Sequence, residues 1–268
     1  MAFTLLHTAD WHLGQKLIHL DRQAEHQKAL EDLLHLLHVE KVDLLIVAGD
    51  VFDLANPPNY ARRQYYDFLQ RLADTPCRHT VIVGGNHDSP SMLEAPRDLL
   101  RAFDIHVVGM AAADPRQQII ELFDLQGQLE AVVAAVPFLR DRDLRSSVLG
   151  ESADDRITGI QAGIKSHDQN LAEHMRDYRE RKIPLITTGH LYAKGASAAA
   201  EQTNIYLGDR ENIAANDFPD CFHYVALGHL HRAQPVEKNR KVRYSGSLIP
   251  LSFSEVKDEK SVTLVRFG

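Results

Sequence analysis

Acidic, amide and histidine side chains recur at five points of the chain, each time at the end of an apolar run. The five stretches are Asp10-Trp11-His12, Gly49-Asp50, Gly85-Asn86-His87-Asp88, Gly189-His190 and Gly228-His229-Leu230-His231. Carboxylate and amide oxygens together with imidazole nitrogens suit Mn²⁺, Fe²⁺ or Zn²⁺ better than Ca²⁺ or a thiolate-bound metal. The donors are too many for one ion. Shared between two ions, they would leave positions for water and a substrate.

The spacing within these stretches fits the same interpretation. Alternate residues of an extended strand point to one face, so a pair such as His229 and His231 could reach two adjacent ions. The glycines before Asp50, His190 and His229 allow tight turns and leave room for a site. A single Asp or His at a strand end is more often a turn or surface residue. Five such stretches, each after an apolar run, are hard to reach by chance.

The elements that position these residues can be predicted from the apolar runs. Segments 3–10, 42–50 and 79–88 resemble buried strands, and helical patterns cover 21–41, 57–74 and 91–103, the last interrupted by Pro96. This alternation predicts a parallel sheet with right-handed crossovers. The carboxyl ends of such strands line the ligand crevice of an α/β sheet, so the polar stretches should gather there.

The second half of the chain is predicted to form a second sheet. Segments 116–125 and 129–138 resemble a hairpin, 140–156 a polar surface segment and 159–182 a long amphipathic helix. Mostly strands follow, within 183–190, 222–231, 232–247 and 261–268. Because no internal repeat or low-complexity linker is present, we expect one domain with two packed sheets and helices outside them.

Composition excludes some classes of protein. The net charge of −7 over 268 residues argues against a broad basic surface for nucleic acid, but not against binding through metal ions. No apolar run approaches the roughly 20 residues of a membrane span, and the first residues do not resemble a signal peptide. We therefore expect a cytoplasmic protein without membrane contact. Cys77 and Cys221 are too few for a disulfide framework and are expected to be buried thiols.

The five stretches resemble the signature of the calcineurin-like metallophosphoesterases. Within that superfamily, "LLHTADWHLGQ", "IVAGDVFDLANPPNYAR", "YVALGHLHRAQ" and "VRYSGSLIPLSFSE" are similar to the SbcD-like nuclease subunits of DNA repair complexes. The likeness covers essentially 1–268 and is weakest at 110–180. It implies an α/β fold, a four-layer α/β/β/α sandwich in which helices flank two mixed sheets. Residues 1–268 would be the nuclease domain, without the capping domain and ATPase-binding segment of this family.

The resemblance also implies roles for individual residues. One metal ion would be held by Asp10, His12, Asp50 and His231, and the other by Asp50, Asn86, His190 and His229. Asp50 would bridge two divalent ions, which are usually Mn²⁺ in this family. His87 would face the scissile phosphate, and Asp88 would orient its ring. The implied function is two-metal-dependent exonuclease and endonuclease cleavage of DNA ends or hairpins in replication, recombination and repair, with an SbcC-like ATPase as partner.

Further contacts are suggested by the residues that flank the motifs. Five side chains could contact DNA phosphates, although charged loop residues are often only solvated: Gln15, Lys16, Arg62, Arg63 and Arg232. The helix at 59–73 is apolar on more than one face, and the resemblance implies a homodimer through this helix and the one at 91–103. A helix packed under a loop would give the same pattern.

Two alternative functions stay open. A small-molecule or cyclic-nucleotide phosphodiesterase of the same superfamily would use the same metal ligands. A non-catalytic scaffold on this fold would usually lack some of those ligands, whereas none is missing here. In addition, Asp53 stands where some archaeal relatives have a second histidine. The balance of exonuclease and endonuclease activity therefore stays open.

Overall fold

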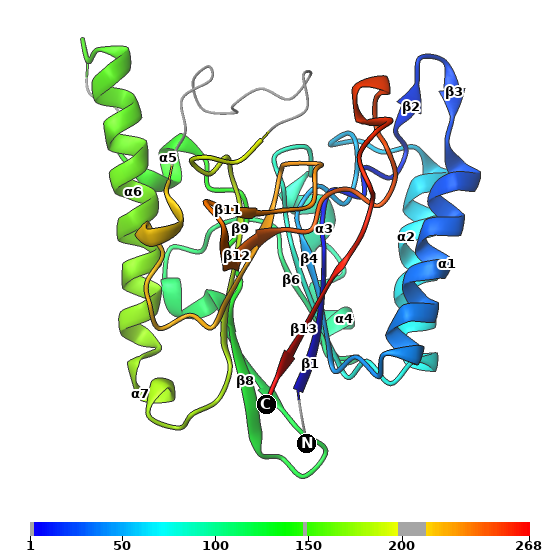
Figure 1. Ribbon diagram of the computed structural model, residues 1–268, viewed down its shortest axis with the longest axis horizontal. Coiled ribbons are helices and arrows are strands. Elements are labelled where there is room, and N and C mark those ends of the chain that lie inside the picture. Colours follow the sequence, from blue (N-terminus) through cyan, green and yellow to red (C-terminus); the bar gives the residue numbers. More distant parts are fainter. Residues whose placement is uncertain (1–2, 147–148, 198–212) are drawn as a thin grey trace.

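Two stacked β-sheets with helices on both outer faces form the molecule, described by a computed structural model for residues 3–146, 149–197 and 213–268 (Figure 1). The first sheet has the order β13-β1-β4-β5-β6, in which β13 is antiparallel to β1 and the other neighbours are parallel. Its strands are β1 (Phe3–Thr8), β4 (Leu44–Ala48), β5 (His79–Val83), β6 (Ile105–Val108) and β13 (Thr263–Phe267).

The second sheet has the order β11-β12-β10-β9-β8-β7. The outermost strands β11 and β7 are antiparallel to their neighbours, and the inner pairs are parallel. The strands are β7 (Ile119–Phe123), β8 (Leu129–Ala134), β9 (Leu185–His190), β10 (Tyr224–Gly228), β11 (Gln234–Val236) and β12 (Asn239–Tyr244). The expectation of two mixed sheets is therefore confirmed, as is the hairpin of β7 and β8.

Helices from the two halves of the chain cover opposite outer faces (Figure 1). One side carries α1 (Gln23–Val39), α2 (Asn59–Arg71), α3 (Pro90–Glu94) and α4 (Arg97–Arg101). The other side carries α5 (Asp141–Leu144), α6 (Ala153–His174) and α7 (Arg176–Arg179). A small ribbon of β2 (Lys16–Leu17) and β3 (Leu20–Asp21) precedes α1, and short 3₁₀ turns occur at Leu72–Asp74, Pro115–Gln118, Ala215–Asp217 and Phe253–Glu255.

Side-chain alternation along the strands creates three separate apolar cores. On β4, Leu45 and Val47 pack with α1 and α2, whereas Ile46 packs against the second sheet. A third core lies between the second sheet and α6, where Val132 meets Ile160. Both faces of each sheet are thus covered, which explains the continuous apolar runs. The predicted four-layer α/β/β/α sandwich is confirmed.

One helix differs from the sequence expectation, and another is interrupted where the sequence predicts. The helix expected at 159–182 begins earlier, at Ala153, because Ser152 and Asp155 form a capping box, with the Asp155 N–H donating to Ser152 Oγ at 3.1 Å. It ends at His174, and α7 follows as a separate turn. The helix expected at 91–103 is divided into α3 and α4 around Pro96, as the sequence predicts, because proline cannot donate a backbone hydrogen bond.

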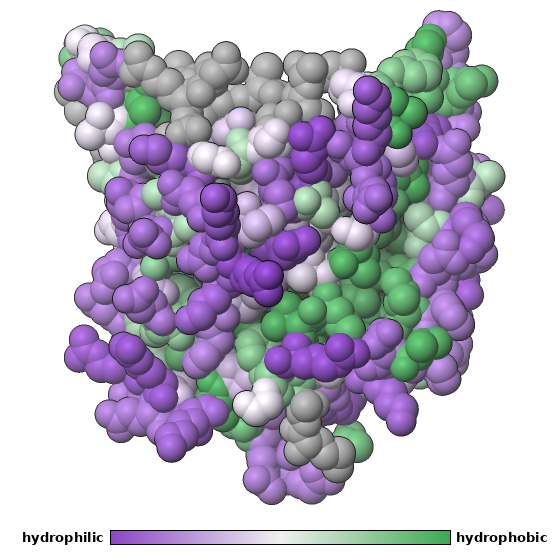
Figure 2. All heavy atoms as spheres, viewed as in Figure 1, coloured by the Kyte–Doolittle hydropathy of each residue, from purple (hydrophilic) through white to green (hydrophobic). Residues whose placement is uncertain are grey.

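The first core reaches the surface beside α1. Figure 2 shows an apolar hollow between α1 and β13, lined by Leu33, Leu36, Leu248, Ile249 and Val262. The segment after β12 thus packs on α1 along one edge of the sandwich. Within the described part of the chain, no helix has the length and apolar character needed to cross a membrane.

Candidate metal centre

The polar stretches meet at one edge of the sandwich, where the carboxyl ends of strands from both sheets lie together. Strand β4 contacts both β9 and β10 across the sandwich. The loops that follow the strands hold one another through the backbone: the Asp10 N–H donates to Gly49 O at 3.0 Å, and the His12 N–H donates to Asp50 O at 3.0 Å. The His229 N–H donates to Asp10 Oδ1 at 2.9 Å. Three loops that are far apart in sequence therefore share one hydrogen-bonded framework.

Four of the predicted ligands have a left-handed backbone. The φ angles are 53° at Asp10, 46° at His12, 51° at Asp50 and 97° at His229. Non-glycine residues adopt such angles at a cost of about 1–3 kcal/mol each, and they cluster at functional sites. The framework therefore holds these side chains in directions that a relaxed strand end would not give them.

Glycines allow the loops to approach each other closely. Gly49 has a φ of 90°, and a Cβ there would lie 2.2 Å from His190 Nδ1. A Cβ on Gly85 would lie 2.1 Å from Asp50 Oδ1, and one on Gly228 would lie 1.8 Å from Ala48 O. The space around Asp50 and His190 thus exists only because these positions lack side chains.

Asp50 lies between two histidines at the middle of the centre. Its Oδ2 is 3.5 Å from His12 Nε2 and 3.2 Å from His190 Nε2, and its Oδ1 accepts the backbone N–H of His87 at 2.9 Å. His190 Nε2 is also 3.0 Å from Asn86 Oδ1. One carboxylate oxygen thus faces donors on both sides, as a bridging ligand does.

The donor atoms form three close groups: two of them each contain three members of one expected ligand set, and the third joins His12, Asp53 and His87. Atoms of Asp10, His12 and His231 lie within 4.8 Å of one another, and so do atoms of Asp50, His190 and His229. The structure therefore brings all seven predicted ligands into one centre. The assignment of individual ions to them stays a prediction.

Two buried atoms indicate that a cation fits this centre. Among the described residues, Asp10 Oδ2 and His12 Nε2 are buried and have no hydrogen-bond partner. A buried carboxylate oxygen without a donor costs free energy, and a divalent ion would remove that cost. Mixed carboxylate and imidazole donors suit first-row divalent metals.

The pKa values show how the charges are balanced before a cation binds. Burial alone would raise the pKa of Asp50, but His190 and His12 bring it well below its usual range. Burial alone would lower the pKa of His190, but Asp50 raises it to about 9. Burial and the neighbouring His190 lower the pKa of His229 to about 3. His229 is therefore neutral at pH 7, and a cation would have to displace the proton of His190.

Three histidines of the centre have their Nδ1 atoms held by groups outside it. His12 Nδ1 is 3.1 Å from Asp53 Oδ1, and His190 Nδ1 donates to Ala48 O at 2.9 Å. His231 Nδ1 is 2.8 Å from a carboxylate oxygen of Glu255. Such contacts fix the ring and the tautomer of metal-binding histidines.

The contacts of Asp53 and Glu255 with histidines were not expected from the sequence. For Asp53, its position three residues after Asp50 was an available signal. Glu255 lies 24 residues after His231, in a polar segment without any periodic pattern. No spacing rule could have identified Glu255.

The expectation that Asp88 orients the His87 ring is wrong. The Asp88 carboxylate is buried and accepts three backbone N–H groups, from Val51 at 3.1 Å, Phe52 at 2.9 Å and Gly85 at 2.8 Å. It therefore ties the loops after β4 and β5 together. The His87 ring is exposed, and its Nδ1 is 2.8 Å from the backbone oxygen of Asp53.

Two of the five predicted phosphate contacts take part in loop structure. Gln15 Nε2 donates to Leu251 O at 2.9 Å. Arg232 Nε donates to Asp258 Oδ1 at 2.9 Å, and the Asp258 side chain is nearly buried. Both side chains thus already have partners in the segment after β12. Their contact with DNA stays a prediction.

The other three predicted phosphate contacts lie in β2 and along α2. Lys16 pairs with Asp21 at 3.2 Å, and Arg62 donates to Asn59 within its own helix. Arg63 is exposed. Exposed pairs of this kind contribute little stability, so these side chains could exchange their partners for phosphates. Their role too stays a prediction.

The fold is a four-layer sandwich, and the edge of its sheets carries donors for two cations. This combination is typical of dinuclear metal-dependent phosphoesterases. The sequence model of the calcineurin-like phosphoesterases matches residues 3–233, and the chain belongs to that family. The family implies divalent metal ions as cofactors.

Three curated relatives are named as the D component of the nuclease SbcCD. The protein of Escherichia coli (strain K12) is 41% identical over 265 residues, that of Rhodobacter capsulatus 39% over 270 and that of Bacillus subtilis 35% over 262. The matches cover 97–98% of this chain. The chain spans 65% of the length of these curated relatives.

Among solved structures, TT1561 of Thermus thermophilus is similar to this chain. The TM-score is 0.51 at 13% sequence identity, and the match covers 92% of this chain and 91% of the other. This likeness supports the fold alone.

Proposed function

We propose that the chain is a divalent-metal-dependent phosphodiesterase that cleaves DNA. The position of Asp50 Oδ2 between His12 Nε2 and His190 Nε2, at 3.5 and 3.2 Å, carries this proposal, because a carboxylate so placed could be shared by two cations. The relatives named as components of a nuclease favour DNA over other phosphodiesters.

We propose the same two ligand sets that the family resemblance implies. Asp10, His12, Asp50 and His231 would hold one cation, and Asp50, Asn86, His190 and His229 the other. The two donor groups within 4.8 Å support this division. When bound, the two cations would polarise the phosphoryl oxygens and stabilise the charge that develops on them. Mn²⁺ is our proposal for the native metal because the resemblance to the family implies it, and the mixed oxygen and nitrogen donors suit Mn²⁺ among other first-row metals.

The charge of the site would attract a phosphodiester although the whole chain is negative. Two divalent cations and the carboxylates of Asp10 and Asp50 leave a local charge of about +2. The net charge of the chain is −7. Attraction for DNA would therefore be concentrated at the centre rather than spread over the surface.

His87 is the residue that we propose for proton transfer. Its backbone N–H donates to Asp50 at 2.9 Å, so it is held directly beside the centre. Its Nδ1–H donates to Asp53 O at 2.8 Å, so Nε2 is the nitrogen that would give a proton to the leaving oxygen when the ring is in its protonated, imidazolium form. Asp88 supports this loop through the backbone and would have no direct contact with the substrate.

Further parts of the proposal concern partners. We propose an SbcC-like ATPase as a protein partner, because the relatives are named as parts of SbcCD. We also propose that the chain is cytoplasmic and that DNA is its substrate. We also propose a homodimer through the helices at 59–73 and 91–103. Exposed apolar side chains support it, since Tyr66 is 42%, Leu99 67% and Phe103 63% exposed.

The test is Mn²⁺-dependent cleavage of single-stranded and hairpin DNA, compared with hydrolysis of bis-p-nitrophenyl phosphate and cyclic nucleotides. We expect the wild-type chain to cleave DNA and Asp50→Ala to have no such activity. Hydrolysis of the small esters without any cleavage of DNA would favour a small-molecule phosphodiesterase instead. A chain that binds no metal ion would be a scaffold.

A further inference from the structure

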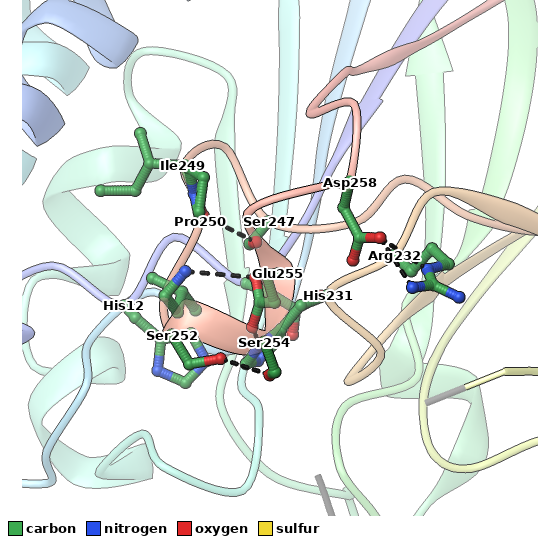
Figure 3. Close-up of polar contacts among 12 residues, drawn as sticks. His12, His231, Arg232, Ser247, Ile249, Pro250, Ser252, Ser254, Glu255 and Asp258 are labelled. Atoms are coloured by element: carbon green, nitrogen blue, oxygen red, sulfur yellow. Dashed lines mark hydrogen bonds and ion pairs between the residues drawn. The ribbon is translucent and has the colours of Figure 1, made fainter. Parts of the chain in front are cut away.

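Glu255 is a buried acid behind His231 that the proposed ligand set does not use (Figure 3). The residue is 1% exposed, and its Oε1 lies 2.8 Å from His231 Nδ1. Its Oε2 accepts the backbone N–H of Leu251 at 3.1 Å and lies 2.5 Å from Lys260 Nζ. Both carboxylate oxygens therefore have partners, and the group cannot rotate away from the histidine without losing them.

Lys260 fixes the acid and the histidine relative to each other. Besides Glu255, its ammonium group donates to His231 O at 2.9 Å and to Ser247 Oγ at 2.9 Å. Only 10% of the side chain is exposed. An ammonium group has three N–H donors, and here each has an acceptor. The pair of Glu255 and Lys260 is thus built into the loop after β12 rather than placed on its surface.

The groups behind the histidines differ between the two sides of the centre. His231 contacts the carboxylate of Glu255, and His12 contacts the carboxylate of Asp53. His190 instead donates to the uncharged carbonyl of Ala48. An imidazole held by a carboxylate is the more basic ligand. The Glu255 charge is balanced by Lys260, but Asp10 and Asp53 still give the side of Asp10, His12 and His231 more negative charge than the Ala48 carbonyl gives the side of His190.

We propose that Glu255 is a positioning residue, which keeps the proton of His231 on Nδ1 and its Nε2 directed at the position formed by Asp10 and His12. That position then binds a divalent cation more tightly than the position of Asn86, His190 and His229. The inference rests on the ligand set proposed above. It does not depend on DNA being the substrate.

Titration calorimetry with Mn²⁺ on the whole chain tests the proposal, with Glu255→Gln as the variant. Asp258→Asn is the matched control, because Asp258 lies in the same segment but pairs with Arg232 (Figure 3). We expect two ions of different affinity in the wild type. Glu255→Gln should weaken the tighter one by roughly 10- to 100-fold. The weaker ion, and both ions in Asp258→Asn, should keep their affinity.

Equal affinities in Glu255→Gln and the wild type would overturn the proposal, and so would an equal loss at both positions. A long-range ¹H–¹⁵N spectrum of the Zn²⁺-loaded wild type is a second test that does not depend on the folding of any variant. We expect His231 to be protonated on Nδ1 alone, and a proton on Nε2 would contradict the proposal. Neither measurement uses DNA, so a failure of the proposed nuclease activity would leave both results standing.

Discussion

Two glycines precede histidines at neighbouring strand ends, and the structure predicts that only one of them tolerates a methyl group. A Cβ on Gly228 would lie 1.8 Å from Ala48 O and 2.8 Å from His190 Nδ1, whereas real Cβ contacts stay beyond 3.0 Å. These two atoms are hydrogen-bonded to each other at 2.9 Å. On Gly189 the nearest atom would be the end of the Leu227 side chain, at 3.0 Å.

The cost of Gly228→Ala can be estimated from the two interactions that it would disturb. The carbonyl of Ala48 would have to move, because a backbone atom at 1.8 Å cannot be accommodated. Overpacking of a core costs about 1–3 kcal/mol, and a broken buried hydrogen bond costs about 1–3 kcal/mol more. Together these amount to about 2–6 kcal/mol, against the 5–15 kcal/mol of a typical domain. Gly189→Ala should stay within about 1 kcal/mol of the wild type, since the Leu227 methyl group can turn aside.

Metal binding should follow the same pattern. His190 would lose the carbonyl that fixes its ring, so Gly228→Ala should weaken Mn²⁺ binding by roughly 10- to 100-fold, and Gly189→Ala should not. Urea unfolding of the metal-free chain, followed by circular dichroism, measures the stability, and calorimetry measures the metal affinity. Wild-type stability and binding in Gly228→Ala would refute the reasoning, as would an equal loss in both variants.

Three other predictions follow from the site, from a buried acid and from the proposed dimer. His87→Ala should keep both Mn²⁺ ions and lose most hydrolysis of bis-p-nitrophenyl phosphate, whereas Asp50→Ala should lose both; a metal-free His87→Ala would contradict our assignment. Burial raises the pKa of Asp168 to about 7. Between about pH 4 and 7 the Asp168 carboxyl is therefore ionised in the unfolded chain but protonated in the folded chain. The free energy of unfolding should fall by up to about 4 kcal/mol as the pH rises through this range. Asp168→Asn should therefore stabilise the chain at pH 8 and hardly at pH 4 in urea unfolding, and a difference independent of pH would argue against this. Phe103→Glu should convert the proposed dimer to a monomer in sedimentation analysis, and equal masses would count against that interface.

The sequence was sufficient to predict where the chemistry gathers. The apolar runs before Asp50, Asn86 and His190 identify strands that are buried on both faces, and such strands are parallel and end at one edge. The four-layer arrangement came from the resemblance to a family, and the order of the strands was not predicted. Both depend on contacts between distant segments, which periodicity does not report.

The sequence was not sufficient to predict the hydrogen-bond partner of each polar side chain. Asp88 follows His87 directly, yet its carboxylate turns inward because three backbone N–H groups converge on it. Glu255 reaches His231 only because a 3₁₀ turn at Phe253–Glu255 and the bonds of Lys260 bring the segment back to the centre. Such contacts between loops follow from tertiary packing and leave no local pattern.

The pair His229 and His231 shows how a correct expectation can rest on an incomplete physical reason. The two side chains do fall into different donor groups, His229 with Asp50 and His231 with Asp10, and Leu230 between them is fully buried. Strand alternation was the expected cause, but β10 ends at Gly228, and His229 has a φ of 97°. A left-handed turn, held by the hydrogen bond from the His229 N–H to Asp10, therefore separates the two imidazoles. The regular alternation of a strand ends where the metal centre begins. The strained backbone of His229 is itself evidence that this stretch is functional.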